Sequence, residues 1–139
     1  MRRYRQIEHT ADRGLQAWGA TLPELFANAA EGMCAIYFDL PAVQPREERA
    51  VVAEGYDREE VLVDWLRQLL YGIEVDHFLP CRFDIARLDD THLEARVWGE
   101  PWDPSRHRWH TGIKAVTYHD LHIEQGKRGV WTVRVIFDT

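Results

Sequence analysis

The chain has 139 residues, a length typical of one domain, so we expect a single domain over residues 1–139. Its 17 basic and 23 acidic side chains give a formal net charge of −6, which argues against a protein that grips nucleic-acid phosphates over a broad face. We expect neither a membrane-spanning helix nor a signal peptide, because no apolar stretch is long enough for either. Cys34 and Cys81 lie far apart and outside any CxxC motif, so we expect no disulfide and a cytoplasmic protein.

The N-terminal third of the sequence predicts two strands and a helix. Alternating apolar residues indicate strands at 3–7 and 15–19, separated by a polar, turn-prone break. The segment 21–24 is typical of a helix start, with a threonine cap, a proline in the first turn and a glutamate three residues after the cap. Apolar residues then recur every three or four positions as far as Tyr37, and 39–41 ends the helix.

The middle of the sequence predicts a strand, a second helix and a hairpin. A loop at 41–48 leads into a strand at 49–56. A second capping box at 57–60, with aspartate as the cap, precedes the clearest apolar helix face of the chain, at 61–73. Strands are then predicted on both sides of a turn, and these strands cover 82–88 and 92–98.

The C-terminal third predicts a long loop and two strands. The loop at 99–112 contains prolines and glycines, and strands at 113–124 and 130–137 flank a turn at 125–129. Helices and strands are therefore partly segregated along the chain, which favours the α+β class. We expect one mostly antiparallel sheet with two helices packed on one face.

Two acidic segments are candidates for metal binding. At the chain end, Asp138 stands beside the carboxylate of Thr139, and hard divalent cations prefer such oxygen ligands. The alternative is a frayed, solvated terminus. The string HTAD at 9–12 combines an imidazole, a hydroxyl and the carboxylate of Asp12 in the polar break. It predicts either a site at a sheet edge or a turn in which Thr10 and Asp12 cap backbone amides.

Other polar residues carry weaker signals. Lys114 and Lys127 are the only lysines among 17 basic side chains, and a lysine at 114 offers a compact, mobile charge for a phosphate or carboxylate, unless it is simply a surface residue. His119 stands among apolar neighbours and is expected in the core, and the seven histidines show no zinc-site spacing. The loop from Trp102 to His110, with Arg106–His110 at its end, places arginines beside tryptophans, which could stack on bases, but the acidic net charge favours a solvated loop anchored by its tryptophans.

Three strings together closely resemble the archease family over essentially the full length of the chain. They are EHTAD at 8–12, KAVTYHD at 114–120 and an aspartate one residue before the end. The resemblance implies the archease fold and a divalent metal bound by Asp12, Asp138 and Thr139, with calcium as the first choice and magnesium or manganese as alternatives. It also places the functional lysine of the family on Lys114.

The resemblance further implies that the protein is not an enzyme but a partner of an RtcB-type RNA ligase, which joins RNA ends in tRNA splicing and RNA repair. The partner would speed formation of the ligase–guanylate intermediate and allow multiple turnovers, so RNA would be met only through the ligase. Arg13 and Thr139 depart from the family pattern, which usually has an aliphatic residue after HTAD and often has one at the C-terminus. Two alternatives stay open: a stand-alone metal-dependent enzyme acting on phosphate esters through Asp12 and Asp138, and a chaperone-like interaction module.

Overall fold

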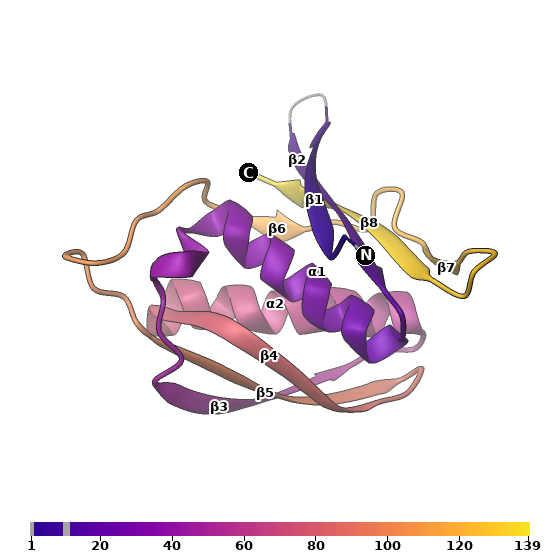
Figure 1. The fold of residues 1–139 in the computed structure, drawn as a ribbon, viewed down its shortest axis with the longest axis horizontal. Helices are drawn as coiled ribbons and strands as arrows, with labels where there is room; N and C mark the ends of the chain where they lie inside the picture. The colour runs from indigo at the N-terminus through magenta and orange to yellow at the C-terminus, as the bar shows by residue number, and fades with distance from the viewer. Residues whose placement is uncertain (1, 10–11) are drawn as a thin grey trace.

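The protein is built from two helices that lie between two antiparallel sheets (Figure 1). The computed structural model describes residues 2–9 and 12–139. Its elements are β1 Tyr4–His9, β2 Asp12–Gly19, α1 Leu22–Tyr37, a 3-10 turn Leu40–Ala42, β3 Glu47–Glu54, α2 Arg58–Asp76, β4 Phe78–Leu88, β5 His92–Pro101, β6 Ala115–Val116, β7 Ile123–Gln125 and β8 Trp131–Asp138. The α+β class is therefore confirmed.

Both helices begin where their capping residues predict. The Thr21 hydroxyl accepts a hydrogen bond from the Glu24 amide at 3.2 Å, and the Asp57 carboxylate accepts one from the Glu60 amide at 2.9 Å. Each bond satisfies an amide that has no partner within its helix. α2 ends at His77, which takes the left-handed conformation common at helix C-termini, with φ of 54°.

The strands form two sheets where a single one was expected. The first sheet has the order β1-β2-β8-β6, with β7 also paired to β8, and the second has the order β3-β5-β4. The physical reason lies in α1, whose buried residues surround the helix instead of forming one stripe. A helix that is apolar on several sides is buried on several sides, so α1 packs against β2 of one sheet and β4 of the other.

The predicted strand at 113–124 is broken in two. β6 and β7 are separated by a turn in which the Leu121 amide donates to the Tyr118 carbonyl at 3.1 Å and Asp120 has φ of 52°. The expectation of a core histidine at this position is wrong, since His119 is exposed and lies 3.2 Å from the Asp120 carboxylate. A residue with positive φ interrupts strand pairing, and aspartate tolerates that conformation better than most residues.

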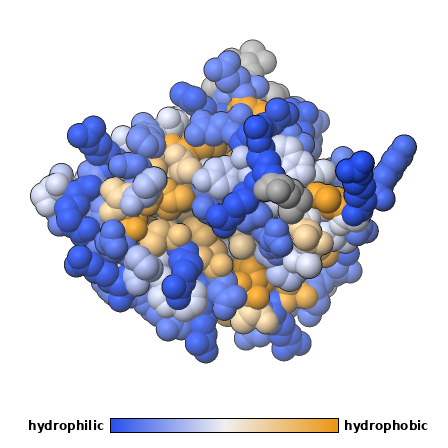
Figure 2. All heavy atoms as spheres, viewed as in Figure 1, coloured by the Kyte–Doolittle hydropathy of each residue, from blue (hydrophilic) through white to orange (hydrophobic). Residues whose placement is uncertain are grey.

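Polar and charged side chains cover most of the face seen in Figure 2, while apolar ones gather in its middle, over α1 and β4. Cys34 of α1 is buried in the core, Cys81 of β4 is half-buried, and both are free thiols. Among the described residues, no helix is long and apolar enough to cross a lipid bilayer.

Candidate functional site

The first sheet brings Asp12 and Asp138 to the same end. β2 begins at Asp12 and β8 ends at Asp138, and these antiparallel strands pair Arg13 with Phe137. Extending this register by one residue places Asp12 opposite Asp138. Side chains at opposite positions of antiparallel strands have Cβ atoms about 4.5–5.5 Å apart. Two carboxylates that are distant in the sequence thus become neighbours.

Lys114 reaches the same end of the sheet through β6. Ala115 pairs with Asp138 on the side of β8 away from β2, and the Lys114 amide donates to the Asp138 carbonyl at 2.7 Å. The Lys114 side chain is exposed. Because Lys114 lies just outside β6, strand alternation does not fix the direction of its side chain. Its backbone nevertheless places a mobile cation next to the end of β8.

The two aspartates share the face of the sheet that points away from the helices. Phe137 is fully buried, so its neighbour Asp138 points to the opposite face by strand alternation. Asp12 follows the same face because Arg13 is the residue opposite Phe137. Asp138 is exposed and Asp12 is half-buried, so this end of the sheet is open to solvent, ions and partners.

Gly14 allows close packing beside this end of the sheet. A Cβ atom at Gly14 would lie 2.6 Å from Cγ1 of Ile7 in β1 and 3.1 Å from Cδ1 of Ile136 in β8. The side chains of Ile7 and Ile136 therefore occupy the space that a Cβ atom at position 14 would need, which favours glycine there. In the sequence, Gly14 reads as the last residue of a turn-prone break, which gives no hint of this role. Gly14 lies two residues after Asp12 and pairs with Ile136. Ile136 in turn lies two residues before Asp138.

We expect Gly14→Val to lower the free energy of unfolding by about 1–3 kcal/mol, because the added atoms overlap the side chains of Ile7 and Ile136. Urea titration followed by circular dichroism measures the change. Gly112→Val is the matched control, since a Cβ at Gly112 meets nothing within 4 Å. Equal stability of the two variants would contradict the packing role of Gly14.

The segment that follows Lys114 is held by β8 and by α2. The amide and the hydroxyl of Thr117 both donate to the Ile136 carbonyl, each at 3.0 Å. From α2, the Arg67 guanidinium donates to the Val116 carbonyl at 3.3 Å and lies 5.4 Å from the centre of the Tyr118 ring. The sequence pattern gives no signal for Arg67, because it stands on the polar side of its helix and its partner is 49 residues away.

Part of the predicted HTAD site lies outside the described residues. This holds for Thr10 and Ala11 and for the side chain of His9. The His9 backbone pairs with Asp12, which fixes where β1 and β2 meet.

The donor set fits a hard divalent cation better than zinc. The carboxylates of Asp12 and Asp138 and the oxygens of Thr139 are all hard ligands, whereas structural zinc sites prefer cysteine and histidine. Within the part of the chain that the structure describes, no three His, Cys, Asp or Glu side chains converge as a metal cage. Calcium takes about 6–8 oxygen ligands. A cation held by these residues would therefore keep positions for water or for a partner molecule.

A second charged cluster, formed around Glu100, anchors the loop after β5. Glu100 is only 2% exposed and accepts hydrogen bonds from both terminal nitrogens of Arg106, at 2.6 and 3.1 Å, and from the Gln44 amide at 2.7 Å. His107 Nδ1 accepts from the Asp103 amide at 2.8 Å, so its Nε2 hydrogen is the one directed at Glu100, at 3.0 Å. The bonds from Arg106 are the main reason that the pKa of Glu100 falls to about 2.

Two tryptophans hold the same loop from outside. Trp102 and Trp109 stack with ring centres 4.3 Å apart and planes at 13°, and Tyr37 of α1 lies 5.4 Å from Trp109. Trp109 remains 44% exposed. The loop is thus anchored by its tryptophans, as expected, but Arg106 and His107 turn inward onto Glu100, a residue that the sequence did not single out.

Comparison with known proteins identifies the family. A profile of the archease protein family (MTH1598/TM1083) matches residues 4–139. The chain belongs to the archease family. An archease of Methanopyrus kandleri is 37% identical over 138 residues, which cover 97% of this chain and 98% of that protein. An archease of Sulfurisphaera tokodaii is 38% identical over 126 residues, which cover 89% of this chain and 90% of that protein.

Solved structures of the archease family share the fold. The solution structure of Methanobacterium thermoautotrophicum protein 1598 superposes with a TM-score of 0.79 at 33% identity and covers 98% of both chains. The crystal structure of a Thermotoga maritima archease, described there as a possible chaperone, gives a TM-score of 0.66 at 24% identity over 100% of this chain and 98% of that one. Membership of the archease family confirms the resemblance seen in the sequence and suggests a non-catalytic protein.

Proposed function

We propose that this archease-family protein is a non-enzymatic, metal-binding activator of an RtcB-type RNA ligase in the cytoplasm. The observation that carries the proposal is the meeting of Asp12, Asp138 and Lys114 at one exposed end of the first sheet. These residues come from the three strings that resemble the archease family. The protein acts on the ligase and contacts RNA only through it.

The acidic pair would hold a divalent cation together with Thr139. Calcium is the first choice, and magnesium or manganese are the alternatives, since all three accept oxygen ligands. Such an ion would supply positive charge that stabilises phosphate oxygens during phosphoryl-type transfer. The exposure of Asp138 supports this role, because open coordination positions can then be filled by the ligase or its nucleotide.

The side chains of this chain contribute mainly orientation and charge. Lys114 carries a compact ammonium on a flexible stem, which suits contact with a triphosphate oxygen. In guanylyl transfer, a ligase nucleophile displaces pyrophosphate from the α-phosphorus of GTP, and correct placement of the reacting groups accounts for much of the rate. Asp12 and Asp138 sit on adjacent strands of one sheet, so they form a rigid base for that placement.

Multiple-turnover ligation tests the proposal directly. An RtcB-type ligase is assayed with GTP, divalent metal and RNA ends, with and without this protein, and the ligase–guanylate intermediate is followed in the same reactions. We expect faster guanylylation and several ligations per ligase molecule only when this protein is present. A ligase that shows no stimulation would contradict the proposal.

Two other functions have specific support. The paired carboxylates of Asp12 and Asp138 would also suit a stand-alone metal-dependent enzyme, which predicts turnover of nucleotides or phosphate esters by the purified protein alone. The exposed apolar residues Val52, Tyr71 and Val75 would suit a chaperone-like module. That function predicts protection of the ligase from aggregation that persists when Asp138 is replaced.

An extension of the chain after Thr139 tests the terminal ligand. We expect a Gly-Ser extension there to weaken calcium binding at least about tenfold, because it removes a carboxylate from the donor set. Isothermal titration calorimetry measures the affinity, and the same extension at the N-terminus is the control. Unchanged affinity would exclude the Thr139 carboxylate as a ligand.

A further inference from the structure

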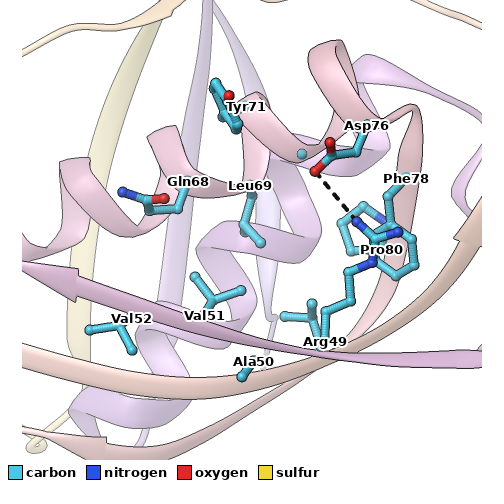
Figure 3. A pocket seen from close by; sticks show the side chains of 12 residues that line it. Arg49, Ala50, Val51, Val52, Gln68, Leu69, Tyr71, Asp76, Phe78 and Pro80 are labelled. Atoms are coloured by element: carbon cyan, nitrogen blue, oxygen red, sulfur yellow. Dashed lines mark hydrogen bonds and ion pairs between the residues drawn. The ribbon is translucent and has the colours of Figure 1, made fainter.

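A groove opens at the edge of the second sheet, far from the aspartates in the fold. It lies between β3 and the C-terminal half of α2, over Val51, Leu69 and Phe78 (Figure 3). Its volume of about 200 Å³ compares with the roughly 150 Å³ of a cavity that accepts benzene. The groove can therefore hold one large apolar side chain.

The β3 edge is more regular than the other edge of the sheet, although it carries charged residues at Glu47, Glu48, Arg49 and Glu54. The opposite edge, β4, contains Pro80 and two shifts of register. β3 instead pairs with β5 without a shift from Glu47 to Glu54, contains neither proline nor lysine, and exposes half of the Val52 side chain. A regular edge with outward-facing backbone groups is a template for another strand, and its charges limit which strands can pair with it.

Hydrogen bonding sets which backbone groups of β3 face outward. The Gly55 amide donates to the Thr91 carbonyl of the β4–β5 turn at 3.1 Å. Every second residue before Gly55, beginning with Ala53, therefore directs its amide and carbonyl groups toward β5. Ala50 and Val52 therefore direct their amide and carbonyl groups away from the sheet. Glu54, in the same phase, sends its amide outward to the Asp64 carboxylate at 2.8 Å. Among the described residues, no other strand pairs with this edge of β3.

Gly72 leaves room above the floor of the groove. A Cβ atom added there would meet nothing within 4 Å. Glycine inside a helix makes that helix less stable than alanine does. Since an alanine would fit at position 72, packing within this chain does not explain the glycine. At the mouth of the groove, the Arg49 guanidinium stacks 4.0 Å from the Phe78 ring and lies 3.5 Å from the Asp76 carboxylate. Arg49 and Asp76 are both partly exposed, so this pair can separate at little cost.

Charge selects the kind of strand that fits. Glutamates at 47, 48 and 54 flank the apolar centre of β3. If two copies of β3 paired about a two-fold axis with Ala50 opposite Val52, Glu48 of one copy would face Glu54 of the other. Like charges at opposite positions destabilise a sheet, so a second copy is disfavoured in this register. Glu48 lies 3.3 Å from Arg96 and Glu54 lies 3.6 Å from His92, and these carboxylates are about half exposed or more. Basic residues of an added strand would share the two glutamates with these partners at little cost.

We propose that β3 and its groove bind an extended segment of a partner protein in which apolar and basic residues alternate. The segment adds to the sheet as a fourth strand, bonded to the backbone of Ala50 and Val52. Alternate side chains of a strand point to opposite faces. An apolar side chain therefore enters the groove beside Gly72, while basic side chains on the other face meet Glu48 and Glu54.

A capped, fluorescein-labelled heptapeptide of alternating lysine and valine is the probe, and fluorescence anisotropy with the full chain measures its binding. We expect Gly72→Leu to weaken binding at least about tenfold by filling the groove, whereas Gly72→Ala, which brings the same gain in helix propensity, stays within about twofold. Val52→Pro removes one outward amide and should also weaken binding at least about tenfold, and Val52→Thr retains that amide and should not. Hydrogen exchange should slow at Ala50 and Val52 when peptide is added.

Several results would overturn this inference. They are failure of the lysine–valine peptide to bind, equal binding of a glutamate–valine peptide, and equal binding to Gly72→Leu. Sedimentation analysis that shows a dimer lost on Val52→Pro would make a second copy the occupant and would overturn it as well. Because Gly72→Leu raises helix propensity, loss of folding is not expected to obscure the result.

Discussion

Asp138→Asn should reduce stimulation of multiple-turnover ligation by on the order of 100-fold, and Asp12→Asn should do the same. Each substitution keeps the size of the side chain but removes one negative charge from the pair that the β2–β8 register places together. Lys114→Ala should abolish stimulation as well or reduce it to a similar extent, because the charge next to the end of β8 is lost. The initial rate of ligation at excess RNA measures all three effects.

A second measurement separates the roles of these residues. Calcium affinity should fall with either aspartate substitution and should hold in Lys114→Ala, since a lysine is not a ligand. Asp84→Asn and Lys127→Ala are matched controls, because Asp84 is exposed on the other sheet and Lys127 lies in the β7–β8 turn. Full stimulation by all three site variants would remove the assignment of the site.

Helices were predictable from local sequence, whereas the arrangement of the sheets was not. The caps at Thr21 and Asp57 act on amides three residues away, so the signal and the structure are both local. The division into two sheets depends on how α1 is buried on several sides, and an apolar pattern does not say how many neighbours a helix has. The turn at Asp120 likewise depends on a single positive φ that the strand-like pattern around it conceals.

The candidate site was also not predictable from local sequence alone. Asp12 and Asp138 each gave a weak signal alone, and their meeting depends on a register between strands from opposite ends of the chain. The resemblance to the archease family implied that Asp12 and Asp138 act together, and this inference did not depend on the geometry of the fold. Gly14 and Arg67 could not be found in this way, because their importance comes from the atoms that surround them in space.

The structure shows where some of the acidic side chains behind the net charge of −6 lie. Carboxylates concentrate at the end of the first sheet, where Asp12 and Asp138 lie, and along β3 at the edge of the second. An acidic protein of this kind can serve RNA ligation without holding RNA, provided that its charges act on a cation and on partner proteins. The two acidic surfaces belong to different sheets, so substitutions at one should leave the other intact.

Glu100→Gln should lower the free energy of unfolding at pH 7 by about 3 kcal/mol, because it removes the charge that Arg106 and His107 surround. The effect has a defined pH dependence. Folding lowers the pKa of Glu100 from 4.5 to about 2, so its stabilisation is fully present above pH 4.5 and is lost as the pH falls toward 2. The natural chain should therefore lose up to about 3 kcal/mol across this window through Glu100 alone.

Urea titrations at several pH values between 2 and 7 test this expectation. The difference in unfolding free energy between the natural chain and Glu100→Gln should be largest at pH 7 and should shrink below pH 4.5. Taking the difference between the two proteins cancels the titration of the other carboxylates. Glu124→Gln is the control, since Glu124 is exposed and should change stability by less than about 0.5 kcal/mol. A difference that does not change with pH would show that Glu100 contributes shape and packing, and that its charge does not stabilise the loop.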